Sequence, residues 1–500
     1  MRRKTANRAT RIGANMSTTI GSWEKMGLNR LDQAAFYRMI WRWHFYAGLF
    51  CLPFVTILAL SGSVYLFKPQ IDAFFDLPYN HMPLSAPARG LDDQVAAALA
   101  AVPRSRIKGL ELRDDPTDAA RVRVVDAQGQ EQRVLVRPDT LEILKVDAEK
   151  WRLSTLMRDI HGSMLLGDAG AIALELAGAW AIVMLLTGLY LWWPRNSIGI
   201  GGVLYPRKGR AFLRDLHAVT GLYVSFFALF LLVSGLPWTK VWGEAFRWSK
   251  GITAQQQVKM DWTTGPSSAK AQRMAAYQAA PQALAEASSA PDAHEGHEGH
   301  EGHVDHAAMK QERSPSRIVG FDRVAAIARD ARLAEPVMLA PPSPKNPNWL
   351  VRSETQNRPL QETLHVEPKS FDVIKREDFS GKPLIDKVVG VGIAAHEGHL
   401  FGVANQLLGL FTALSFLTLV VTSVLMWLRR RPIGALGAPP ALVTPPRLAP
   451  ALVLLILAIG VFLPTLGVSL ILVLGFEATA RRFLPGVSRW LGLTPRAAPV

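Results

Sequence analysis

The sequence His161-Gly-Ser-Met-Leu-Leu-Gly167 precedes an apolar run that ends in Thr187-Gly-Leu-Tyr-Leu-Trp-Trp-Pro-Arg195. A second copy starts at His396-Glu-Gly-His-Leu-Phe-Gly402, and its apolar run ends in Thr422-Ser-Val-Leu-Met-Trp-Leu-Arg-Arg430. The histidines, glycines, threonines and first tryptophans of the two copies all match at one numbering offset, 235. We interpret this gap-free match as an internal repeat, in which each copy begins with a histidine at the mouth of a membrane helix.

The composition indicates a membrane protein with large extramembrane parts. Hydrophobic residues make up 49% of the 500 residues, and they are concentrated in blocks long enough to cross a bilayer. The net charge of +15 comes from basic groups that adjoin these blocks, at the N-terminus, in residues 195–214 and at Arg429-Arg-Arg431. This placement is typical of cytoplasmic loops and argues against nucleic-acid binding. The single cysteine, Cys51, excludes intrachain disulfides and iron–sulfur ligation.

Polar segments divide the chain into alternating membrane and extramembrane parts. The positive-inside rule assigns the basic segments to the cytoplasm and the long intervening segments to the periplasm of a bacterial inner membrane, with the first block an uncleaved anchor. In order, we predict a cytoplasmic basic tail (1–40), a first span (41–68), a first periplasmic domain (69–160), a second span (161–194), a cytoplasmic loop (195–214), a third span (215–239), a low-complexity insert (240–316), a second periplasmic domain (317–390), a fourth span (396–428), a cytoplasmic loop (429–447), a C-terminal apolar block (448–483) and a tail (484–500).

Two of these parts need a closer reading. The first periplasmic domain reads as a small α+β unit, with a helix over 92–102 and strands around 107–112, 121–125, 132–136 and 141–146. The C-terminal block has Pro464 in its middle and is long for one crossing and short for two. We favour a hairpin of two short helices, with a single kinked helix as the alternative.

The first and third spans also match. His44 aligns with His217 at an offset of 173, and Gly48 aligns with Gly221 at the same offset. The outer segments match at offsets of 230, for Val136 to Ile143, and 229, for Asp93 to Ala97. The predicted fold is therefore a bundle of four core transmembrane helices in two parallel repeats, each repeat carrying one α+β periplasmic domain, with one or two extra C-terminal helices.

Four histidines occupy repeat-equivalent helix mouths. The chain has 12 histidines, of which five lie in the tract described below, and these four are among the other seven: His44, His217, His161 and His396. Symmetry places His44 opposite His217 on the cytoplasmic side and His161 opposite His396 on the outer side. Two facing imidazoles in a helical bundle suit the two axial positions of a haem, so we predict two bis-histidine haem b sites. Interfacial aromatic anchoring is the alternative, and zinc is a poorer match because each level offers only two ligands.

Neighbouring residues extend these predicted sites. His399, three residues after His396 and expected on the same helix face, is an alternative ligand. Arg42, Arg158 and Arg214 lie within three residues of candidate histidines and are predicted to pair with haem propionates, although Arg42 and Arg214 also suit positive-inside anchoring. Glu175, within the second span, is either a proton- or substrate-handling acid or an interfacial one.

The insert carries a different metal-binding signal. Its HEG repeats form a tract over 294–306 that is expected to be disordered and to bind a divalent metal loosely. A neutral spacer is the alternative. The tract's histidines are His294, His297, His300, His303 and His306.

Several motifs, in order, resemble the PepSY-associated transmembrane family, which includes iron-regulated membrane proteins and ferric-siderophore reductases. They are Trp43-His-Phe-Tyr-Ala-Gly48, Leu189-Tyr-Leu-Trp-Trp-Pro-Arg195, Asp215-Leu-His-Ala-Val-Thr-Gly221, and His396 to Gly402 with Met426-Trp and Arg429-Arg-Arg-Pro432. The resemblance covers about residues 38–432, and the outer units are similar to PepSY domains. It implies a di-haem protein that passes electrons to a periplasmic ferric complex. The His-rich insert and the C-terminal block depart from this pattern.

The leading hypothesis is therefore a haem-dependent transmembrane ferric reductase of iron uptake. No nicotinamide or flavin fingerprint is present, so a cytoplasmic protein or a membrane quinol is expected to donate the electrons. The alternatives are a non-enzymatic metal-binding accessory protein and a regulator of a periplasmic peptidase.

Overall fold

A computed structural model describes residues 30–195, 200–253, 319–344, 346–439, 441–442 and 450–493. The chain divides into two compact units. Unit 1 comprises residues 1–60, 169–258 and 411–500, and unit 2 comprises residues 61–168 and 259–410. The predicted basic tail up to residue 29 and the His-rich tract 294–306 lie outside the described residues.

Among the described residues, four helices are long and apolar enough to cross a membrane. They are α2 (Arg30–Tyr65), α6 (Gly167–Trp192), α7 (Phe212–Gly235) with the flanking turns η3 (Gly209–Ala211) and η4 (Leu236–Trp238), and α12 (Val403–Arg430). The predicted spans are confirmed in number, and three of the helices begin at other residues than the predicted spans. The first helix starts earlier, at Arg30, and the second and fourth start after their histidines, not at them.

Glycines explain the late start of the second and fourth spans. Gly167 has φ of 60° and Gly402 has φ of 59°, a left-handed conformation that glycine adopts without strain. Each glycine therefore separates a preceding helix from the membrane helix. His161 lies on α5 (Leu153–Ser163), and His396 is the last residue of α11 (Leu384–His396).

The C-terminal apolar block forms two helices, α13 (Pro450–Phe462) and α14 (Pro464–Phe483). They are separated by Leu463, and a Cβ on Gly467 would lie 2.5 Å from the carbonyl oxygen of Gly460. The predicted pair of short helices is thus confirmed, and only glycine allows the backbones to come this close. Two further helices lie in other predicted segments: α8 (Val241–Thr253) at the start of the predicted insert and α15 (Pro485–Leu491) in the predicted tail.

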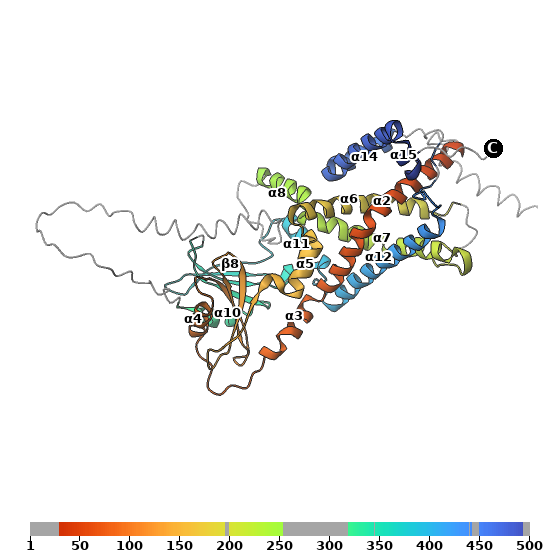
Figure 1. The fold of residues 1–500 in the computed structure, drawn as a ribbon. Coiled ribbons are helices and arrows are strands. Elements are labelled where there is room, and N and C mark those ends of the chain that lie inside the picture. Colours follow the sequence, from red (N-terminus) through yellow and green to blue (C-terminus); the bar gives the residue numbers. More distant parts are fainter. Residues whose placement is uncertain are drawn as a thin grey trace, which may run out of the picture. The chain divides into compact units, whose positions relative to one another are not determined.

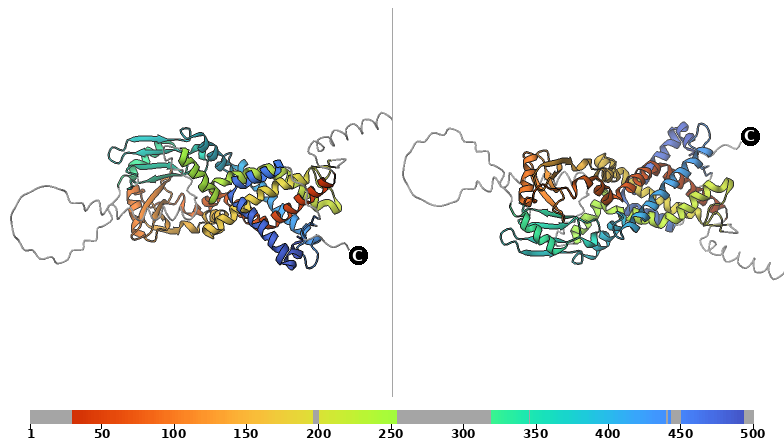
Figure 2. Two further views of the ribbon diagram at one scale, coloured as in Figure 1. Left: turned by 90° about the horizontal axis from the view of Figure 1, so that it is seen from above. Right: turned by 90° about the horizontal axis from the view of Figure 1, so that it is seen from below.

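The described part of unit 2 contains one antiparallel sheet of eight strands, in the order β4-β3-β2-β1-β5-β6-β7-β8. Figure 1 shows this sheet with helices α4 (Leu91–Ala101) and α10 (Phe321–Ala331) beside it. The strands are β1 (Arg106–Leu112), β2 (Ala120–Val125), β3 (Glu131–Val136), β4 (Ile143–Ala148), β5 (Val337–Ala340), β6 (Trp349–Ser353), β7 (Thr363–Val366) and β8 (Val373–Glu377). Figure 2 shows β1–β4, in orange, beside β5–β8, in teal. The four strands predicted in the first outer segment are confirmed, but both segments share one sheet that is joined where β1 pairs with β5.

The two halves of the sheet repeat each other's irregularities. The register shifts between Leu135 and Val136 in the β3–β4 pair and between His365 and Val366 in the β7–β8 pair, so the two shifts match at an offset of 230. Helices α4 (Leu91–Ala101) and α10 (Phe321–Ala331) are also offset by 230, and both pack in the apolar core on one face of the sheet. The offset of 229 read for this helix from the sequence was therefore wrong by one position.

Short helices and turns complete unit 2. These are α3 (Lys68–Asp76), η1 (Leu77–Tyr79), η2 (Glu149–Trp151) and η5 (Arg358–Leu360). They include charged side chains that pair with sheet residues, such as Asp76 with Arg133 at 2.6 Å.

Candidate functional site

Two pairs of histidines face each other, one pair in each unit. In unit 1 the ring centroids of His44, on α2, and His217, on α7, are 6.3 Å apart with an interplanar angle of 83°. In unit 2 the centroids of His161, on α5, and His396, on α11, are 6.4 Å apart with the same angle of 83°. The structure thus brings together the four residues in the two pairs that symmetry predicted, with nearly identical geometry.

Neighbouring helices orient the rings of unit 1. Nδ1 of His44 lies 3.0 Å from the carbonyl oxygen of Met184 and 3.2 Å from Oγ1 of Thr187. A carbonyl only accepts, so Nδ1 carries the proton and Nε2 keeps its lone pair. A hydrogen bond of this kind fixes the tautomer of metal-ligating histidines in other proteins.

His217 repeats this arrangement on the other side of the pair. Its Nδ1 lies 3.1 Å from Oγ1 of Thr422, and a backbone hydrogen bond joins its ring to Leu419. Thr422 and Leu419 match the two partners of His44 at the repeat offset of 235. Sequence comparison found the threonine pair but assigned it no role.

Small residues lie against one ring of each pair, His161 in unit 2 and His44 in unit 1. Oγ of Ser61 lies 3.1 Å from Nδ1 of His161, and a Cβ on Gly62 would lie 3.0 Å from Cε1 of the same ring. In unit 1, a Cβ on Gly188 would similarly lie 3.0 Å from Cε1 of His44. Each of these two imidazoles therefore fits against a glycine, which leaves no room for a larger residue without a shift of the ring.

His399 does not lie where it was predicted. Helix α11 ends at His396, and His399 follows in a turn, where its backbone N–H donates to Ala394 over 2.8 Å. The expected shared helix face with His396 is therefore wrong, and His396 is the residue that faces His161. Burial, with a smaller contribution from Lys68, lowers the pKa of His399 to about 4, so its ring is neutral at pH 7.

The three arginines predicted to bind propionates all have protein partners. Arg42 donates to the carbonyl of Pro439 and, over 3.2 Å, to the hydroxyl of Tyr46. Arg214 donates to the buried carboxylate of Asp215 over 2.7 Å. Arg158 pairs with its neighbour Asp159 at 3.1 Å, and it is about one-third exposed. Of the three, Arg158 has the weakest partner, because exposed ion pairs contribute little.

Glu175 has a structural partner that the sequence did not reveal. Its carboxylate accepts hydrogen bonds from the backbone N–H groups of Val241 over 2.7 Å and Trp242 over 3.1 Å, at the first turn of α8. An acid at this position satisfies free N–H groups and the positive end of the helix dipole. Glu175 therefore caps a helix, and this contact explains its burial.

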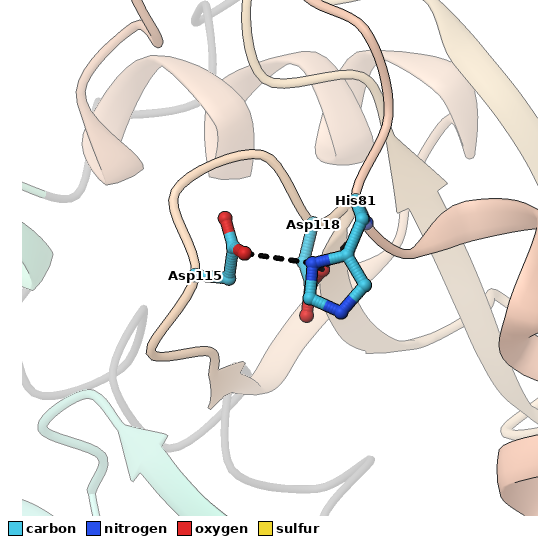
Figure 3. Close-up of side chains that lie close together, drawn as sticks. All are labelled: His81, Asp115 and Asp118. Carbon is cyan, nitrogen blue, oxygen red and sulfur yellow. Dashed lines mark hydrogen bonds and ion pairs between the residues drawn. The ribbon is translucent and has the colours of Figure 1, made fainter.

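A cluster in unit 2 was missed by the sequence analysis. His81, Asp115 and Asp118 place one potential ligand atom each within 4.8 Å of one another (Figure 3). However, Nδ1 of His81 lies 2.7 Å from Asp115, and Arg113 donates twice to Asp118. The neighbouring guanidinium disfavours a cation, and the carboxylates already accept hydrogen bonds that hold this loop.

The chemistry of the two histidine pairs fits a haem. Two metal–nitrogen bonds of about 2 Å, together with the half-widths of the rings, separate the centres of two axial imidazoles by about 6 Å. Both observed separations agree with this value. Beside His217, an apolar groove of about 400 Å³ on α7 and α12 is lined by leucines and by Thr418 and Thr422. The lining of this groove reaches the pair through Thr422, which contacts His217.

Comparison with known proteins gives one result on the family. No curated protein matches the chain. The family model described as PepSY-associated TM region matches residues 41–430. The matched segment contains all four paired histidines and both halves of the sheet.

Proposed function

The chain belongs to the PepSY-associated transmembrane family, and we propose that it is a di-haem electron-transfer protein of the bacterial inner membrane that reduces a periplasmic ferric complex. The observation that carries this proposal is the presence of two perpendicular histidine pairs with separations of 6.3 and 6.4 Å. Bound haem would supply one-electron chemistry between its ferric and ferrous states. The protein's part is to hold the axial nitrogens, exclude water and control access.

The repeat supports this function because it supplies two equivalent sites. We infer that span, outer domain and second span form a unit that occurs twice in parallel. The matching bonds of His44 and His217, the sheet irregularities at an offset of 230 and the glycines before α6 and α12 all support the duplication.

The proposed direction of electron flow follows from the charge pattern. The basic segments next to His44 and His217 favour the cytoplasmic side for this pair and the periplasmic side for His161 and His396. Electrons would enter from a cytoplasmic donor or a membrane quinol and leave at the periplasmic pair. The acceptor is a ferric complex, which releases its iron as Fe(II).

A visible spectrum of the full chain purified in detergent tests the proposal. We expect b-type haem at two per chain, and about half of it lost in either His44→Ala or His161→Ala. His365→Ala, which changes a histidine in the sheet, is the control and should keep both haems. Absence of haem from the wild type contradicts the proposal, and loss of both haems from each single variant contradicts independent sites.

Electron paramagnetic resonance adds a test of the geometry. Axial imidazoles with planes near 83° should give the highly anisotropic low-spin ferric signal of perpendicular ligands. A rhombic signal typical of parallel planes would contradict the orientation that Thr187 and Thr422 impose on the rings.

The second candidate function is a non-enzymatic metal-binding accessory protein. The cluster of His81, Asp115 and Asp118 brings three potential ligand atoms together, and Arg113 beside Asp118 weighs against a cation there. Zinc or copper binding at micromolar affinity that is lost in Asp115→Asn, in a protein without haem, would favour this alternative over electron transfer.

A further inference from the structure

Four buried polar atoms without a hydrogen-bond partner lie on two short segments of unit 2. Oδ1 of Asn357 and Nε of Arg358 belong to the connection between β6 and β7. Oε2 of Glu397 and Nε2 of His399 belong to the turn after α11. A buried polar atom without a partner is costly, so four of them on neighbouring segments point to a polar ligand.

The first segment packs against α11, the helix that leads into the second segment. Turn η5, which includes Arg358, contacts α11, and Cβ of Arg358 lies 3.7 Å from the position that a Cβ on Gly390 would take. The preceding residue, Gln356, donates to the hydroxyl of Tyr65 over 3.4 Å. The connection between β6 and β7 therefore lies against the helix that ends in His396.

Charged groups of both signs surround this region. Arg358, Lys68 and Arg158 are the cations whose charges act on Glu397. Lys68 is paired with Asp72 at 2.7 Å and Arg158 with Asp159 at 3.1 Å, whereas the Nε–H of Arg358 has no partner. Arg358 therefore keeps a charged donor available to a ligand that carries negative charge.

We propose that Arg358 and Asn357, with Lys68 and Arg158 as neighbouring cations, form a binding site for a carboxylate-type oxyanion beside the His161–His396 pair. The Nε–H of Arg358 donates to the oxyanion, and Oδ1 of Asn357 accepts from a hydroxyl or a bound water. Two sources offer this chemistry: a propionate of haem held by the pair, or a hydroxycarboxylate ferric chelate that arrives as electron acceptor. Both sources rest on the function proposed above, but the oxyanion site can be tested without it.

The experiment compares the full chain in detergent with Arg358→Gln and with Arg358→Lys, which keeps the charge but loses the planar fork. Arg376→Gln is the matched control, because Arg376 lies in strand β8 of the same unit, is more than half exposed and pairs with Glu362. Calorimetry measures the affinity for citrate. Spectroscopy and potentiometry measure the haem content and the midpoint potential of each haem. Kinetics compare the KM for ferric citrate with the KM for a neutral ferric trihydroxamate.

Each source predicts its own pattern of results. If the ligand is a free acceptor, Arg358→Gln should bind citrate at least tenfold more weakly and should have a raised KM for ferric citrate only. Its haem potentials should be unchanged, and Arg358→Lys should recover part of the citrate affinity. A propionate predicts a shifted potential or lost haem at the His161–His396 pair only, and no citrate binding.

The proposal is overturned if Arg358→Gln changes neither citrate affinity nor haem, or if Arg376→Gln has the same effect. A wild type that lacks haem contradicts the proposed function, and citrate binding that depends on Arg358 would still support the oxyanion site. A wild type that lacks haem and binds no citrate overturns both.

Discussion

At the scale of single residues, Glu111 shows how unit 2 tolerates buried charge. Its carboxylate lies 2.8 Å from Arg121 and 3.8 Å from Arg123, on the sheet face opposite the apolar core. Burial alone would raise the pKa of Glu111, but Arg121, Arg123 and Arg133 outweigh burial and hold the pKa below its usual value. The network therefore stabilises the fold only while Glu111 is ionised.

We expect Glu111→Gln to destabilise unit 2 by about 3 kcal/mol at pH 7, because it leaves buried guanidinium groups without their anion. Since the folded-state pKa is lowered, the stabilisation is present above the ordinary value of 4.5 and is lost as the pH falls below it. Hydrogen exchange of β1–β3 peptides should therefore differ between variant and wild type at pH 7 and converge towards pH 3. The exposed substitution Glu142→Gln is the control, and an equal difference at both pH values would contradict this account.

Two glycines allow each histidine pair to be perturbed separately. A methyl group at Gly188 would meet His44, and one at Gly62 would meet His161, each at 3.0 Å from Cε1. We expect Gly188→Ala to weaken haem binding at the His44–His217 pair about tenfold and Gly62→Ala to do so at the other pair, because each displaces one ring. Haem titration followed by potentiometry distinguishes the two sites. Gly162→Ala, with no neighbour within 4 Å, should alter neither.

At the scale of elements, α4 and α10 cap each other. The carboxylate of Asp92 accepts from the N–H groups of Gly320 and Phe321 over 2.8–3.1 Å. The carboxylate of Asp322 accepts from Leu91 over 2.8 Å and Asp92 over 3.3 Å. Each helix therefore depends on a residue of the other for its N-cap.

This reciprocal capping predicts that a substitution in one helix affects the other, which is far away in the sequence. Asp92→Ala should destabilise the first turn of α10 by about 1 kcal/mol, the usual value of a cap, and spare the first turn of its own helix. Exchange of the amides of residues 320–325 should become about fivefold faster, while Leu91 and Asp92 stay protected. Asp93→Ala, one residue further on, is the control. Faster amide hydrogen exchange in α4 alone would show that Asp92 caps its own helix and not α10.

The joint between α13 and α14 depends on one glycine. We expect Gly467→Ala to destabilise this helix pair by about 2 kcal/mol, because the added Cβ would lie 2.5 Å from the Gly460 carbonyl oxygen and force the backbones apart. Limited proteolysis near residue 463 should then become faster. Gly475→Ala, on the same helix with no neighbour within 4 Å, should leave the rate unchanged or lower it.

At the scale of the whole molecule, local patterns in the sequence were sufficient to predict most elements. Hydropathy located the four spans, and alternation located β1–β4, since both depend on neighbouring residues only. Periodicity could not show that two outer segments form one sheet, because the pairing of Leu110 with Leu339 leaves no local pattern. The small error in the helix offset arose because identical residues were aligned, whereas the helix bounds repeat at an offset of 230.

The candidate site was predictable where it follows the repeat. The histidine pairs came from matched spacings, and the structure places both pairs face to face. His399 and Glu175 could not be predicted, because the end of α11 and the cap of α8 depend on tertiary contacts. Asn357 and Arg358 were missed for the same reason, since they approach α11 only after the sheet has formed.

The central β1–β5 pairing also has a consequence for synthesis. Strand β1 ends at Leu112 and its partner β5 begins at Val337, so the ribosome must synthesise the long intervening segment before the pair can form. At roughly 5–20 residues per second, the edge of β1 waits on the order of 10–45 s without its partner. The chain must protect that edge throughout this interval, because an unpaired strand edge is a template for aggregation. Strand β1 is therefore open to mispairing until β5 has been synthesised.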